Sequence, residues 1–143
     1  SMKKIAFYSL VLIFAFAKVQ AASMSETMVA VKHASPMPGL MMVIKQHGDK
    51  LNLSEEQQQS LATWAKEHHP VVTELALEVK NGENTLHDAA LEGDSKEDMM
   101  AQLETLLEKR QKIAAIKLDC RDNMRKLLND EQWKKLIELY KGK

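Results

Sequence analysis

The sequence predicts an all-α protein: a long kinked helical hairpin with a short helix before it and another after it. Apolar residues recur every three or four positions over residues 54–91 and again over residues 99–127, which is the period of a helix face. Only 5% of the residues are aromatic, whereas methionine occurs nine times. Such an interior of Leu, Met, Val and Ala favours helices over sheets, and alternating strand patterns are absent.

Residues 1–21 have the features of a secretory signal peptide. Two lysines precede an apolar run over residues 5–17, and Val19 and Ala21 are small residues at the expected distances from a cleavage site. The run is shorter than the ~20 apolar residues that a membrane span needs. We therefore expect cleavage, a periplasmic mature protein and no membrane span after processing.

The charge balance of the processed chain is mild. The whole chain has 20 basic and 20 acidic residues, and residues 1–21 contain three lysines and no acid, which leaves a net charge of −3. This balance does not indicate nucleic acid or a strongly anionic membrane as a partner. The remaining length suits one small domain.

The first elements after the signal peptide are weakly marked. Residues 22–35 have no strong apolar period, which predicts a flexible N-terminal arm. The helical domain is expected over residues 36–143. It begins with a stiff segment that contains Pro36 and Pro38. A short helix follows from Leu40 and is expected to end at Gly48 and Asp49.

A five-residue phrase occurs twice, as "LSEEQ" from Leu53 and as "LNDEQ" from Leu128. In each copy the second residue can accept a hydrogen bond from the backbone N–H three residues on, and the Gln can reach back to complete a capping box. The Leu before each cap can staple the entering chain to the first helical turn. The phrase therefore predicts two helix starts. Its residues are Leu53, Ser54, Gln57, Leu128, Asn129 and Gln132.

The elements between and after these starts follow from the same patterns. Pro70 should bend the first long helix because it removes a backbone hydrogen bond. A Gly93-Asp94-Ser95 turn then leads to a second long helix that folds back, and the final helix begins at the second phrase. Two helices leave one side of their apolar stripe open, which predicts a homodimer.

The two phrases, each opening a helix in an all-helical chain behind a signal peptide, resemble the LTxxQ motif of the Spy/CpxP family. This family comprises small periplasmic stress proteins of Gram-negative bacteria. The resemblance covers the chain after residue 21 in order and length. Ser54 and Asn129 stand where the family motif has Thr, and all three residue types can cap a helix.

The resemblance implies a cradle-shaped antiparallel dimer whose concave face receives unfolded or misfolded envelope proteins without ATP. In CpxP-like members the same surface restrains a sensor kinase through its periplasmic domain. The related ZraP- and CnrX-like proteins, associated with metal resistance, bind zinc, nickel, cobalt or copper. Their ligands are not shared across the family, so none transfers to this chain by motif.

Candidate site residues allow two interpretations each. Soft donors four apart on one helix face can hold a soft metal ion, but Cys and Met are also ordinary core residues. The Met-rich first helix can pack on the hairpin or expose flexible side chains to clients. The metal candidates are Cys120, Met124, His68, His69 and His87, and the client-binding candidates are Leu40, Met41, Met42 and Ile44.

The sequence contains no catalytic motif, neither a nucleophile elbow nor a phosphate-binding glycine loop nor a His-Glu-x-x-His helix. We therefore expect a protein that is not an enzyme. The favoured hypothesis is a periplasmic ATP-independent holding chaperone, or envelope-stress adaptor, of the Spy/CpxP type. The alternatives are a periplasmic metal-binding sensor or buffer for a soft or borderline ion such as copper, zinc or nickel, and a regulator of a sensor kinase's periplasmic domain.

Overall fold

The computed structural model describes residues 26–142, and the expected signal peptide, residues 1–21, lies outside the described residues. Within this range the chain is helical and contains no strand, which confirms the predicted all-α class. No helix in the range combines the length and the hydropathy that crossing a bilayer requires. The elements after residue 39 are α2 (Leu40–His47), the 3-10 turn η1 (Gly48–Leu51), α3 (Glu55–Glu92), α4 (Lys96–Leu127) and α5 (Asp130–Tyr140).

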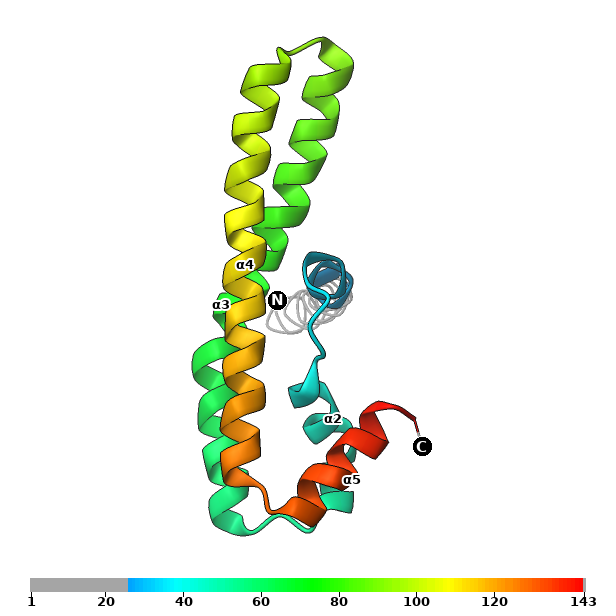
Figure 1. Cartoon of the computed structure of the whole chain (residues 1–143), viewed down its shortest axis with the longest axis vertical. Helices are drawn as coiled ribbons and strands as arrows, with labels where there is room; N and C mark the ends of the chain where they lie inside the picture. Colours follow the sequence, from blue (N-terminus) through cyan, green and yellow to red (C-terminus); the bar gives the residue numbers. More distant parts are fainter. Residues whose placement is uncertain (1–25, 143) are drawn as a thin grey trace, which may run out of the picture.

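Helices α3 and α4 form the predicted hairpin and lie side by side along their length (Figure 1). They have 38 and 32 residues, so they span about 57 Å and about 48 Å at 1.5 Å per residue. Gly93 ends α3 in a left-handed conformation with φ 88°, which glycine adopts without a steric penalty. The side chain of Ser95 then accepts a hydrogen bond from the Asp98 N–H at 3.2 Å and starts α4.

Helix α3 stays continuous through Pro70 and Gly82, the two residues in it that least favour a helix. Pro70 has no N–H to donate, yet the helix runs unbroken across it, and α3 passes from one side of α4 to the other in Figure 1. At Gly82, a Cβ would collide with the side chain of Leu106 on α4. The missing side chain therefore lets α4 pack closely against α3.

The prediction of a flexible arm over residues 22–35 is wrong for residues 26–34, which are helical. Ala30 and Ala34 are 1% and 0% exposed. Because these two alanines are small and four residues apart, they let this helix lie close against the hairpin. Alanine is only weakly hydrophobic, so the two residues do not produce a clear apolar period in the sequence. The core cluster that they join contains Val72, Ala76, Val79 and Ile113.

Charged side chains also hold helix 26–34 on the hairpin. Arg110 donates to the backbone carbonyl of His33 at 3.1 Å and to the carboxylate of Glu83. The His33 Nε2 lies 2.6 Å from the other carboxylate oxygen of Glu83. Burial by itself raises the pKa of Glu83, but the hydrogen bonds and charges of Arg110 and His33 outweigh it and lower the pKa.

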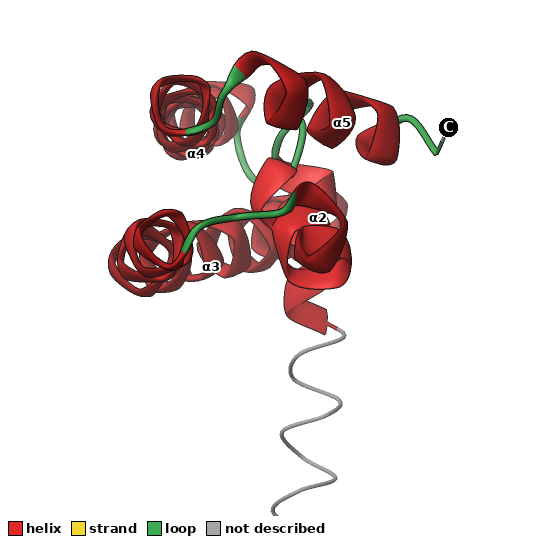
Figure 2. Ribbon diagram, turned by 90° about the horizontal axis from the view of Figure 1, so that it is seen from below, coloured by secondary structure: helices red, strands yellow, loops and turns green. Residues whose placement is uncertain are grey.

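The two short helices cover one end of the hairpin, with α2 beside α3 and α5 beside α4 (Figure 2). Their apolar faces close a second core around the end of α4. This core brings together residues from both ends of the described chain. Its buried members are Leu40, Val43, Leu51, Leu61, Cys120, Met124, Leu128 and Leu136.

Candidate functional site: paired motifs beside an apolar groove

Both capping boxes are present, as the repeated phrase predicts. The Gln57 N–H donates to the Ser54 Oγ at 3.1 Å, and the Ser54 N–H donates to the Gln57 Oε1 at 2.9 Å. At the second copy, the Gln132 N–H donates to the Asn129 Oδ1 at 2.8 Å and the Asn129 N–H donates to the Gln132 Oε1 at 3.0 Å. Each phrase therefore starts its helix by the same reciprocal pair of bonds.

The two phrases also meet in space. The Gln57 Nε2 lies 2.9 Å from the Gln132 Oε1, and the Gln132 Nε2 lies 3.0 Å from the Gln57 Oε1. Each amide group thus donates to the other. We call this pair the glutamine clasp. It joins the start of α3 to the start of α5.

Each glutamine of the clasp additionally binds backbone that precedes the other phrase. The Gln57 Nε2 donates to the carbonyl of Leu127 at 3.0 Å. The Gln132 Nε2 donates to the carbonyls of Leu51 and Asn52, both at 3.2 Å. Gln132 is only 8% exposed, so its amide takes part in a buried network in which every polar atom has a partner. The clasp therefore fixes the ends of η1 and α4 as well.

The two leucines that precede the caps, Leu53 and Leu128, pack into the core beside the clasp. Leu128 is 4% exposed and belongs to the buried cluster. Leu53 is half-buried and packs against it. The leucine of each phrase therefore contributes to one shared core at this end of the molecule.

We expect loss of either cap to weaken the fold measurably. Ser54→Ala or Asn129→Ala should lower the free energy of unfolding by about 0.5–2 kcal/mol, because a backbone N–H at the helix start loses its acceptor. Urea unfolding followed by circular dichroism measures the change. Ser60→Ala, at an exposed position inside α3, is the matched control and should cost nothing. Equal effects of Ser54→Ala and Ser60→Ala would contradict the role of the cap.

An open apolar groove lies between α2 and α3, next to the clasp. It has a volume of about 620 Å³, which is within the usual range for ligand pockets. Lys45 and Asp49 are its charged lining residues. The apolar lining comes from Met41, Ile44, Leu53, Leu61, Ala62 and Ala65. We call this feature the α2–α3 groove.

The structure separates the four client-binding candidates. Met41 and Ile44 line the α2–α3 groove. Leu40 is 4% exposed and lies in the core, and Met42 is half-buried but does not line the groove. Half of the apolar lining comes from α3, as Leu61, Ala62 and Ala65, and the sequence indicated none of these three as client-binding residues. Their helical spacing indicates burial but does not show which partner covers them.

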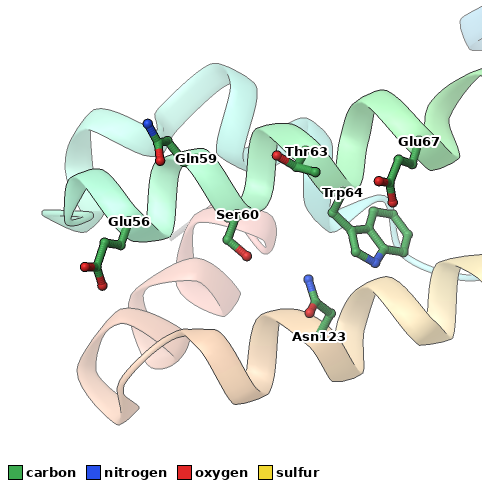
Figure 3. A pocket seen from close by; sticks show the side chains of 7 residues that line it. All are labelled: Glu56, Gln59, Ser60, Thr63, Trp64, Glu67 and Asn123. Carbon is green, nitrogen blue, oxygen red and sulfur yellow. The ribbon is translucent and has the colours of Figure 1, made fainter.

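A second, polar cleft of about 390 Å³ lies between α3 and α4. In Figure 3 the side chains of Ser60 and Trp64 point toward Asn123 of α4. Two glutamates, Glu56 and Glu67, also line it. No histidine lines this cleft beside Ser60.

Two of the metal candidates lie inside the core. Cys120 and Met124 are 7% and 0% exposed and pack among aliphatic side chains. Burial raises the pKa of the Cys120 thiol to about 11, against the opposing charge of Lys117. At neutral pH the thiol is therefore protonated, so a metal ion that bound there would have to displace its proton.

The three histidine candidates are differently placed. The His68 ring stacks on Trp64 with centroids 3.8 Å apart, and its Nδ1 lies 2.9 Å from the Trp64 carbonyl, so Nδ1 carries the proton. The pKa of His69 is lowered by partial burial and by the charge of Lys45. His87 is exposed and pairs with Asp88. Residues 26–142 contain no group of three or more His, Cys, Asp or Glu side chains arranged to hold a metal ion.

Comparison of the chain with protein-family models, with curated proteins and with solved structures found no match. The resemblance to the Spy/CpxP family therefore depends on the two motifs and on the element order.

Proposed function

We propose that this protein is a periplasmic holding chaperone or envelope-stress adaptor of the Spy/CpxP type, which shields apolar segments of unfolded proteins without ATP. The observation that carries the proposal is the α2–α3 groove, which is open to solvent and lined mainly by aliphatic side chains. Met41 and Ile44 supply its wall on α2. Methionine is unbranched and polarizable, so this wall can adapt to differently shaped side chains.

The size of the groove suits transient holding. A volume of about 620 Å³ accommodates a short apolar segment, and each large aliphatic side chain that is buried contributes roughly 1.5–3 kcal/mol. Such contacts are individually weak and depend little on sequence. A client can therefore leave and refold without an energy source. The charges of Lys45 and Asp49 beside the apolar wall let polar client backbone remain hydrated.

A homodimer would present two such grooves. Linking two weak sites raises the overall affinity for a long unfolded chain without any new contact. The side of the α3–α4 hairpin that faces away from helix 26–34 is the surface that we propose for this dimer, in the cradle arrangement that the family resemblance implies. Restraint of a sensor kinase's periplasmic domain by the same surface is a compatible adaptor role.

Removing both soft donors tests the chaperone against the metal-binding alternative. Cys120→Ala with Met124→Leu deletes the thiol and the thioether while keeping the core apolar, so we expect lower stability but a helical fold. Suppression of client aggregation should persist, and chelators should leave it unchanged. The assay is light scattering of a heated or chemically unfolded client protein.

The wild-type protein purified from the periplasm is the control in this assay, with its metal content measured by mass spectrometry. One result would replace the chaperone proposal with the metal sensor or buffer. Protection would then be absent in the folded double variant, and copper(I) would restore it to the chelator-treated wild type but not to the variant.

A further inference from the structure

The hairpin has a surface near its turn that no described element covers. Helix 26–34 lies across the middle of the hairpin, and beyond it α3 and α4 project alone to the turn (Figure 1). Leu106, packed at Gly82, is 6% exposed. Between residues 83 and 105 no residue is buried. This end of the molecule is therefore a bare pair of helices.

An apolar stripe runs along α4 in this region. Met100, Leu103 and Leu107 are spaced by three and four residues, which places them on one side of the helix. Met100 and Leu107 are 55% and 49% exposed. Arg110 continues the same spacing and contacts His33 of helix 26–34. The tip stripe, Met100, Leu103 and Leu107, therefore extends the side of α4 on which that helix already lies.

The same region is strongly acidic. Residues 83–108 contain eight acidic side chains and one basic side chain, a net charge of −7. Of these carboxylates, Glu83 and Asp88 have partners in ion pairs. Within residues 26–142 the other six make none, namely Glu92, Asp94, Glu97, Asp98, Glu104 and Glu108. A partly exposed apolar stripe beside unneutralised carboxylates is complementary to a surface that is both apolar and cationic.

We propose that the tip stripe docks a cationic amphipathic helix of another protein. Helix 26–34 shows that the hairpin accepts a helix on this side, because Ala30 and Ala34 seat it directly on the core. The unpaired carboxylates select a partner that carries Lys or Arg beside its apolar face. This surface is distinct from the α2–α3 groove, so the inference goes beyond the proposed function.

A second copy of this chain is a poorer match for the surface. Residues 109–142 have ten basic and five acidic side chains. Half of those basic side chains already form ion pairs, namely Lys109, Arg110, Arg121, Arg125 and Lys135. Docking a copy through them would require these pairs to be broken.

Binding of designed peptides to the full chain tests the proposal. The probe is a labelled Leu/Lys peptide of about 18 residues, long enough to form a stable amphipathic helix. A Leu/Glu peptide of the same pattern and a scrambled Leu/Lys peptide are the controls. Fluorescence anisotropy should show saturable binding of the Leu/Lys helix alone. Its Kd should rise roughly tenfold when salt is raised to about 0.5 M, because screening weakens exposed charge contacts.

Two pairs of variants locate the site. Met100→Ser with Leu107→Ser, and separately Glu104→Lys with Glu108→Lys, should each raise the Kd roughly tenfold without changing the thermal unfolding, because all four side chains are exposed. The matched charge control is Glu67→Lys with Glu74→Lys, two exposed positions on α3 far from the turn, which should leave the Kd unchanged. Met41→Ser in the α2–α3 groove should also leave it unchanged.

Other outcomes overturn the inference. Equal binding of the Leu/Glu peptide, or unchanged binding by both tip variants, would show that the tip stripe is not the docking surface. Loss of binding in Met41→Ser would assign the peptide to the α2–α3 groove. Tip variants that abolish self-association in sedimentation, but leave peptide binding intact, would show that a second copy covers this face.

Discussion

Gln132→Glu is expected to lower the free energy of unfolding by about 3–5 kcal/mol, because it buries a charge without an opposite partner. The Gln132 Nε2 donates to the carbonyls of Leu51 and Asn52 and to the Gln57 Oε1. A carboxylate at this position has no proton to donate and would place negative charge against three oxygen acceptors. Only 8% of the residue is exposed, so water cannot compensate.

Urea unfolding followed by circular dichroism at neutral pH measures this loss. Gln59→Glu is the matched control, since Gln59 is exposed near the start of α3 and its replacement should change stability by no more than about 0.5 kcal/mol. Similar losses for both variants would show that the clasp contributes nothing beyond local helix capping.

The loss in free energy of unfolding that Gln132→Glu causes should also depend on pH. The introduced carboxyl is destabilised as an anion in the folded state, so its folded pKa lies above its unfolded value of about 4.3. The folded state then binds more protons, and the difference from wild type shrinks as the pH falls through the folded pKa. A deficit that stays constant as the pH is lowered would mean that packing, and not the charge, causes it.

The helices were predictable because their signals are local. Ser54, Ser95 and Asn129 each cap a helix through a side chain that acts on backbone three residues away. Gly93 ends α3 through its own conformation. Each signal is complete within one turn of the chain, so no tertiary information is needed to recognise it.

The glutamine clasp was not predicted, although the topology implied it. Its partners are 75 residues apart. Local helix capping alone already explains why each phrase contains the residues that it does. In an antiparallel hairpin, however, α3 begins where α4 ends, so a phrase before α3 and a phrase after α4 must lie at the same end. The repetition was therefore a tertiary signal as well as a local one.

Two other features depend on packing that the apolar period does not encode. Helix 26–34 is held by alanines and by the Arg110 contacts to His33 and Glu83, and neither produces an apolar stripe in the sequence. The α2–α3 groove is a place where side chains fail to fill space. A sequence records which residues are apolar, but not where their packing leaves a gap.

The comparison of Met41→Asp with Met42→Asp tests the chaperone proposal most directly. The two methionines are adjacent on α2, but only Met41 lines the groove. An aspartate at residue 41 would put a charge in the path of an apolar client segment and should remove essentially all protection, because the burial that holds the client, at roughly 25 cal/mol per Å², would be lost. The same charge at residue 42 lies outside the groove.

The measurement is light scattering of an aggregating client at equal concentrations of each variant. Circular dichroism first establishes that the two variants are equally helical, and thermal unfolding establishes that both are folded. The account predicts that Met41→Asp fails to suppress aggregation and that Met42→Asp protects as the wild type does. Full protection by a folded Met41→Asp protein, or equal loss in both variants, would contradict the assignment of client binding to the α2–α3 groove.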